Sequence, residues 1–379
     1  MLTRAVRTRP RGSDQVLVWF ISPHGFGHAA RSSAIIAACS ARRPDLRHHV
    51  FTSVPRGFFR DSLPGVSVGF HRLECDIGMI QKTPLEEDIE GTIRALDRLP
   101  LKAGPELDTV VREVAATGCS LVISDISPLG LIVADRLGCP GILVENFTWD
   151  WVYRAYDDPR LAGFGAQMER IFSTATVRIQ TEPVCKVVDS SHVVAPVSRS
   201  PRTPKADLRE KLGIPADHRL LLLSLSGSTS TIVPKPLRAM PATTLAVPAG
   251  SPEPESEQGI VRVPTSGGLY HPDLVAASDL VVGKLGYSTV AEIYQTGNAF
   301  AFLRRPRFPE SPILERFVTA HLPSEALPED WLENPALPSL LEDLLARPRP
   351  TGCLLYTSPS PRDSCIHRVC RLLLESRGG

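Results

Sequence analysis

The chain has 379 residues, of which 42% are hydrophobic and 22% are charged, and its formal net charge is +1. This length and composition are typical of a globular protein with two domains. The balanced charge gives no reason to expect nucleic acid as a partner. No apolar run is long enough for a transmembrane helix, although peripheral contact with a membrane stays open. Residues 1–13 are Arg-rich without an apolar core, so we expect a disordered basic tail and no secretory signal.

The cysteine pattern points to a reducing compartment. Eight cysteines are present, none of them in a CxxC pair, and their spacing fits no zinc site. Several lie in apolar stretches, as buried free thiols do. We therefore expect a cytoplasmic protein without a structural metal.

Short apolar runs alternate with helical patterns through residues 14–197. The first run, VLVWFI at residues 16–21, is typical of a buried parallel strand. The alternation predicts an α/β domain with a parallel sheet. The further strands expected here are 49–52, 66–70, 121–124 and 141–144, and the helices are 29–41, 87–114 with a break near 100–105, and 129–137.

A second α/β unit is predicted over residues 205–352. Residues 198–204 are rich in Ser, Arg and Pro, which is typical of a linker. The Pro-, Glu- and Ser-rich stretch 249–258 indicates an exposed loop. The expected helices are 206–211 and 288–295, and the expected strands are 220–225, 243–247, 260–263, 280–282 and 299–303.

The last part of the chain, residues 353–379, resembles translated cloning sequence. CLLYTSPSPRD at 353–363 and VCRLLLE at 369–375 resemble the two halves of a sequencing-library adapter, in the order in which they are joined. We therefore exclude this tail from fold reasoning and expect poor packing there. A well-packed helix over 369–375 against the first domain would refute this origin.

Three segments carry residues suited to chemistry. The first is the strand-to-helix loop SPHGFGHAAR at 22–31. Gly25 and Gly27 permit a tight turn close to a ligand, and His24 and His28 lie where open α/β sheets bind ligands. An imidazole there is suited to general base catalysis. For either histidine alone, a helix cap or a backbone hydrogen bond is an equal alternative.

The second segment is VISDISP, in which Asp125 follows a strand on the same sheet edge. Its carboxylate can orient a histidine, or it can cap the next helix. The sequence leaves both roles open.

The third segment is GKLGYST, which joins a strand to a helix. Two glycines permit close backbone approach, two hydroxyls lie at the helix start, and the helix dipole favours a diphosphate there. The spacing differs from that of a Walker A loop, and an ordinary turn without a ligand is the alternative. The residues singled out are Gly283, Lys284, Gly286, Ser288 and Thr289. Further on, Glu310 is either an acceptor of sugar hydroxyl bonds or a surface acid beside three arginines.

These segments together resemble the GT-B glycosyltransferases. The likeness is to a bacterial family related to family 28 and to the glycosyltransferase-like half of plant L-arabinokinases. It is carried by HGFGHAAR, by residues 121–153 with NFTWDWVY, and by residues 273–310 with GKLGYSTVAE. The resemblance implies two Rossmann-like domains whose parallel sheets face an interdomain cleft.

The resemblance also implies roles for particular residues. His28 matches the base that deprotonates the acceptor, although Arg31 stands where the family has proline, and Asp125 resembles the acid that orients this base. His24, Gly25 and Gly27 complete the acceptor loop. Glu292 resembles an acid that contacts ribose. The donor diphosphate would lie against the third segment and against a second Gly/Ser loop at Gly227 and Ser228.

The resulting hypothesis is an inverting, metal-independent transfer from a nucleoside-diphosphate sugar, UDP-sugar first among them, to an acceptor hydroxyl. No cofactor would be bound tightly. Two alternatives stay open: a non-catalytic sugar-nucleotide-binding module, and a sugar-nucleotide epimerase of the same architecture. Fold alone does not decide between them.

Overall fold

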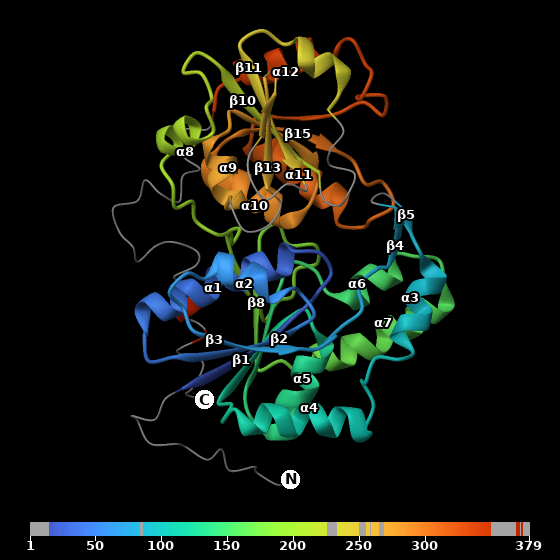
Figure 1. The fold of residues 1–379 in the computed structure, drawn as a ribbon. Coiled ribbons are helices and arrows are strands. Elements are labelled where there is room, and N and C mark those ends of the chain that lie inside the picture. The colour runs from blue at the N-terminus through green and yellow to red at the C-terminus, as the bar shows by residue number, and fades with distance from the viewer. Residues whose placement is uncertain are drawn as a thin grey trace.

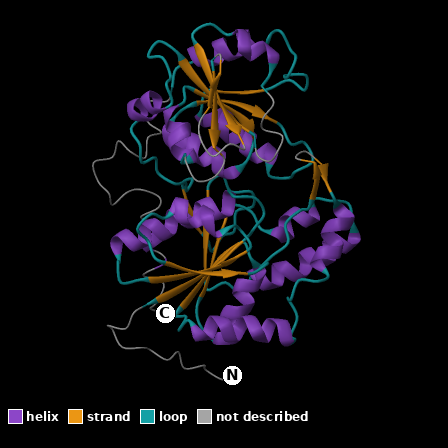
Figure 2. Cartoon of the chain, in the orientation of Figure 1, coloured by secondary structure: helices purple, strands orange, loops and turns teal. Residues whose placement is uncertain are grey.

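The protein is described here by a computed structural model, which covers residues 15–83, 86–225, 233–249, 255–257, 259–264, 269–349, 369–371 and 373. The expected basic tail at 1–13 lies outside these residues. Two seven-stranded sheets, each flanked by helices, form the lower and upper halves in Figure 1. Figure 2 shows the same two layers of strands with helices between them.

The first sheet has the order β3-β2-β1-β6-β7-β8-β9, and all its pairings are parallel. Every side chain of the central strand β1 is buried, as expected for an apolar run covered on both faces. The strands are β1 (Val16–Ile21), β2 (Arg47–Thr52), β3 (Val68–Arg72), β6 (Leu121–Asp125), β7 (Gly141–Glu145), β8 (Val177–Thr181) and β9 (His192–Val194).

The helices of this half connect parallel strands. The expected break in the segment 87–114 separates two of them. Gly138 ends another in the left-handed conformation at φ 64°, which glycine adopts without strain. The helices are α1 (Gly27–Arg42), α2 (Arg56–Ser62), α3 (Ile89–Leu96), α4 (Pro105–Ala116), α5 (Pro128–Leu137), α6 (Trp149–Arg154) and α7 (Pro159–Phe172), and a small hairpin is formed by β4 (Gln81–Thr83) and β5 (Glu86–Glu87).

The second sheet has the order β12-β13-β11-β10-β14-β15-β16 and is parallel except for β12. The prediction of an exposed loop over residues 249–258 is therefore wrong for residues 255–257, which pair with β13 as an edge strand. The strands are β10 (Arg219–Ser224), β11 (Thr243–Ala249), β12 (Glu255–Glu257), β13 (Ile260–Pro264), β14 (Leu280–Lys284), β15 (Ala299–Leu303) and β16 (Ser324–Ala326). The helices are α8 (Lys205–Lys211), η1 (Lys235–Ala239), α9 (His271–Ala277), α10 (Tyr287–Thr296), α11 (Ser311–His321) and α12 (Leu337–Ala346).

The two halves meet at the starts of α1 and α10. A Cβ placed on Gly27 would lie 3.7 Å from the Ser288 hydroxyl oxygen, so the two loops approach to van der Waals distance. Figure 1 shows α1 and α10 facing each other across the boundary. The carboxyl ends of β1 and β14, which lead into these helices, are thereby directed at a common region.

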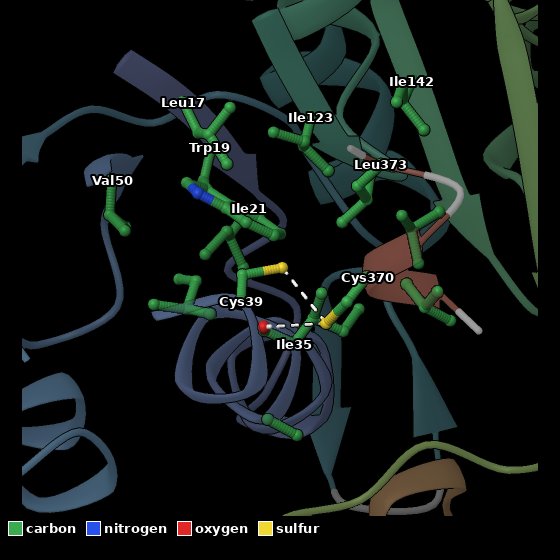
Figure 3. Packing of buried hydrophobic residues seen from close by; sticks show 14 of the residues in the cluster. Leu17, Trp19, Ile21, Ile35, Cys39, Val50, Ile123, Ile142, Cys370 and Leu373 are labelled. Atoms are coloured by element: carbon green, nitrogen blue, oxygen red, sulfur yellow. Dashed lines mark hydrogen bonds between the residues drawn. The ribbon is translucent and has the colours of Figure 1, made fainter. Parts of the chain in front are cut away.

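Part of the C-terminal tail packs against the first half. Val369, Cys370 and Leu373 are fully buried in the core cluster formed on β1 and α1. Figure 3 shows Cys370 beside Cys39, with the two sulfur atoms 3.1 Å apart. The expectation of poor packing is wrong for these residues, because their apolar side chains belong to the core cluster formed on β1 and α1. This packing counts against an adapter origin of the tail. The adapter origin itself stays a prediction.

Candidate functional site

A buried histidine–carboxylate pair lies at the start of α1. The Nδ1 atom of His28 is 2.9 Å from Oδ1 of Asp125. The imidazole is only 7% exposed, and burial lowers its pKa although Asp125 opposes this shift. A neutral ring that donates from Nδ1 keeps a lone pair on Nε2, as a general base requires.

The carboxylate of Asp125 accepts hydrogen bonds from three side chains. Besides His28, Ser32 Oγ donates to Oδ2 at 2.8 Å and Arg31 Nε donates to Oδ2 at 3.0 Å, while Arg31 Nη2 contacts Oδ1. Burial alone would raise the pKa of Asp125, but Arg31 and His28 outweigh it and hold the pKa at about 2. Helix α5 begins only after Ser127 and has no side-chain cap. Of the two roles open for Asp125, these contacts favour the orientation of His28.

Arg31 extends this network toward the second half. Its Nη1 atom donates to the side-chain oxygens of Asn146 at 2.9 Å and Thr181 at 3.2 Å. Because the Asn146 oxygen is occupied, its amide nitrogen points away and donates to Glu310 Oε1 at 2.7 Å. The guanidinium also lies over the ring of Tyr287, 5.0 Å from its centroid. A chain of contacts therefore joins Asp125 to two residues of the second half.

Glu310 is buried rather than a surface acid. It is 4% exposed, and burial raises its pKa while the bond from Asn146 opposes the shift. The surface role left open by the sequence is therefore wrong. Asn146 was singled out only as part of the NFTWDWVY motif, and its position just after β7 was the one signal of a role at the sheet edge.

The third segment forms the start of α10 as expected. Gly283 is required by close approach, because a Cβ there would lie 2.8 Å from the Ser224 carbonyl oxygen. Gly286 is the N-cap of α10, and Ser288 lies in its first turn with Thr289. Burial lowers the pKa of Lys284 to about 8, and Arg305 adds to this effect. A helix start beside a lysine favours negative charge, and binding of a diphosphate there stays a prediction.

Glu292 is occupied by protein groups. Its Oε1 accepts from Arg199 Nη2 at 2.9 Å, and its Oε2 is 2.6 Å from His271 Nδ1. The other nitrogen of His271 is 2.9 Å from the hydroxyl of Ser224. A ribose contact by Glu292 stays a prediction that requires these partners to be displaced. Gly227 and Ser228 lie outside the described residues.

His24 differs from His28 in its environment. Its ring packs against Gly78, where a Cβ would lie 2.2 Å from Nδ1, and edge-on to Trp149 at 5.1 Å between centroids. Burial, reinforced by the nearby His28, lowers its pKa to about 3. A base that weak is nearly unprotonated at neutral pH and a poor proton acceptor. Gly25 takes φ 71°, which favours glycine, and lies exposed with open space at its Cβ position.

Two hollows are found in the described part of the chain, and neither is lined by the His28–Asp125 pair. One of about 570 Å³ is lined by α2 and β3, and one of about 380 Å³ lies between the segment after β8 and helix α11. Neither is lined by His28 or Ser288. In the described part of the chain, no group of three or more His, Cys, Asp or Glu side chains is arranged to hold a metal ion. No helix among the same residues has the length and apolar character needed to cross a membrane.

Comparison with known proteins supports the architecture. No family model matches the chain. L-arabinokinase of Arabidopsis thaliana is 26% identical over 316 residues, which is 80% of this chain but 29% of that protein. The chain thus spans less than a third of this curated relative.

Solved structures match over nearly the whole chain. MurG of Acinetobacter baumannii is 16% identical with a TM-score of 0.55, covering 95% of this chain and 99% of that one. UGT89C1 of Arabidopsis thaliana is 13% identical with a TM-score of 0.63, covering 96% and 100%. A UDP-glucosyltransferase of Polygonum tinctorium is 12% identical with a TM-score of 0.61, covering 97% and 99%. With one parallel sheet and one that is parallel except for β12, the chain has the GT-B fold of these solved structures.

Proposed function

We propose that the chain is a glycosyltransferase that moves a sugar from a nucleoside-diphosphate sugar to an acceptor hydroxyl with inversion. The observation that carries the proposal is the contact between two loops. His28, paired with Asp125, lies at the start of α1, and Ser288 in the first turn of α10 lies beside the neighbouring Gly27 across the domain boundary.

In this proposal His28 accepts the acceptor proton on Nε2 while Asp125 fixes the ring through Nδ1. The acceptor oxygen then attacks the anomeric carbon, and the bond to the diphosphate breaks. Charge on the leaving diphosphate is stabilised by the backbone N–H groups of α10 and by Lys284. These donors supply the stabilisation without a metal. UDP-sugar is the first donor to test, because one matching structure is a UDP-glucosyltransferase.

The proposed location is the cytoplasm. Within the described residues, the buried Cys39, Cys75 and Cys370 are thiols outside any disulfide bond, as a reducing compartment favours.

The test begins with a thermal-shift screen of nucleotide sugars, because a donor that binds only the folded state raises Tm. Release of nucleoside diphosphate is then measured with an acceptor panel. We expect His28→Ala to lower kcat by about 10²- to 10⁴-fold at unchanged donor affinity. His192→Ala, an exposed histidine on β9, is the matched control and should keep full activity. Equal rates for both variants would refute the assignment of His28.

A second candidate is a sugar-nucleotide-binding module without transfer activity. Arg31 favours it, because this cation competes with the His28 ring for the negative charge of Asp125. An imidazolium formed in catalysis would therefore be stabilised less than in an isolated His–Asp pair. Donor binding without diphosphate release across the acceptor panel would favour this candidate.

A further inference from the structure

Unpaired polar atoms are concentrated at one place in the domain boundary. Within the described residues, seven buried side-chain nitrogen or oxygen atoms have no hydrogen-bond partner. Four of the seven belong to Arg305, Glu87 and Tyr156: the arginine Nε and Nη2, the glutamate Oε2 and the tyrosine hydroxyl. Arg305 is 5% exposed and Glu87 is 7% exposed. Leaving such groups unpaired is unfavourable, so each requires an explanation.

The three residues lie together but do not satisfy one another. Nη2 of Arg305 is 3.8 Å from Oε1 of Glu87, which is too long for a hydrogen bond. Tyr156 lies close enough to both for their charges to influence its pKa, which burial raises. The cluster is therefore a set of hydrogen-bond donors and acceptors that lie near one another without forming hydrogen bonds among themselves.

The cluster spans both halves of the molecule beside the His28 site. Arg305 follows β15 in the second half, Glu87 belongs to β5, and Tyr156 follows α6 in the first half. Figure 1 places β5 and α6 on the same side of the boundary.

An aromatic series leads from this cluster to the proposed base. The Arg305 guanidinium lies over Phe308 at 4.3 Å from the ring centroid. The Phe308 ring is 6.1 Å from that of Phe147, which is 5.8 Å from the imidazole of His28. The rings of Phe308 and Phe147 therefore lie between the cluster and the proposed base.

The free atoms define a ligand chemistry. Nε and Nη2 form one edge of the guanidinium, and this edge matches the two oxygens of a carboxylate in a bidentate pair. Oε2 of Glu87 accepts a hydrogen bond, and the Tyr156 hydroxyl both donates and accepts. Both groups can form hydrogen bonds with alcohol hydroxyls next to the ligand's carboxylate. The cluster is therefore complementary to a carboxylate on a hydroxyl-rich ring.

We propose that Arg305, Glu87 and Tyr156 form a subsite for an acidic sugar, a uronic acid whose carboxylate is bound by Arg305 and whose neighbouring hydroxyls are bound by Glu87 and Tyr156. This inference rests on the proposed transferase function and names its substrate class. The acidic sugar is either the donor sugar or the acceptor, since both present the same chemistry. Because the atoms are buried and come from both halves, the sugar enters when the halves separate.

Calorimetry with matched acidic and neutral probes tests the subsite. The donor arm compares UDP-glucuronate with UDP-glucose, and the acceptor arm compares glucuronate with glucose in the presence of UDP. In one arm we expect the acidic probe to bind about 10- to 100-fold more tightly, as for a charge-assisted bidentate pair. Arg305→Gln should abolish this preference, and Arg305→Lys, which keeps the charge without the fork, should keep part of it.

Arg304→Gln is the matched control, because the neighbouring Arg304 is exposed and pairs with Glu315 on the surface. It should keep the full preference. Equal binding of acidic and neutral probes by the wild type, or an unchanged preference in Arg305→Gln, would overturn the subsite and leave the transferase proposal standing. Binding of none of these probes, nor of any other nucleotide sugar in the thermal-shift screen, would overturn both.

A second measurement needs no ligand. Tyr156→Phe removes an unpaired buried hydroxyl, so we expect a raised Tm in the unliganded protein. The same variant should weaken binding of the acidic probe. A lowered Tm would show that the hydroxyl already has a partner and would remove it from the subsite.

Discussion

Replacing Arg31 by methionine tests the buried network at the base. Arg31 is 1% exposed, and its guanidinium contacts Asp125, Asn146 and Thr181. The variant leaves a fully buried carboxylate without its cation, and breaking a buried ion pair in this way costs about 3–5 kcal/mol. For a domain of this size, that corresponds to a fall in Tm of roughly 6–20 °C.

The effect has a defined pH dependence. Arg31 lowers and Asp125 raises the pKa of His28, so removal of the guanidinium should raise this pKa. A higher folded-state pKa adds stability that is present at low pH and lost as pH rises through it. The Tm deficit of Arg31→Met should therefore be smaller at pH 5.5 than at pH 8, and NMR titration of the imidazole should show the upward shift directly.

Arg43→Gln provides the control, because this arginine pairs with Asp45 at the surface with both side chains at least 41% exposed. A surface pair of this kind contributes at most about 1 kcal/mol. The double variant Arg31→Met/Asp125→Asn should recover much of the lost stability, since no charge remains buried alone. If Arg31→Met melts within about 2 °C of Arg43→Gln, the assigned network is wrong.

Two further predictions concern the glycines of the donor segment and a second buried acid. Gly283→Ala should destabilise the protein by about 1–3 kcal/mol, because the new methyl group meets the Ser224 carbonyl oxygen at 2.8 Å. Gly286→Ala has open space at its Cβ, so its free energy of unfolding should change little while its affinity for the donor falls. Denaturant titration measures the first quantity and calorimetry the second. Equal stabilities of Gly283→Ala and Gly286→Ala would contradict the clash. Burial raises the pKa of Asp76 from 3.8 to about 7 although Trp149 donates to it, so ionisation of the folded state costs roughly 4 kcal/mol above that pH. The folded form is favoured while the carboxyl is protonated, and the wild type should lose stability relative to Asp76→Asn as pH rises from 4 through 7; parallel melting curves of the two proteins across this range would disprove the shift.

The chain order by itself predicted parallel sheets and placed His28 and Asp125 near strand ends, while the role of Asp125 stayed open. Alternating apolar runs and helical segments predict parallel sheets whose carboxyl ends share an edge. Strands β1 and β6 are neighbours, with Ile21 opposite Asp125. The end of β6 and the start of α1, which follows β1, therefore bring Asp125 and His28 together across 97 positions of sequence. Both residues were found because a strand end is a local signal and the sheet order follows from the fold.

Side-chain partners were decided only by the tertiary structure. The occupation of Glu292 by Arg199 and His271 and the joining of Arg31 to Glu310 through Asn146 depend on segments far apart in the chain. So does the packing of the half-buried His24 ring against Gly78 and Trp149. The unpaired edge of Arg305 is equally invisible in sequence, where three arginines after a strand are typical of a surface. A hydrogen bond or its absence depends on distances of tenths of an ångström, which packing sets and residue order does not.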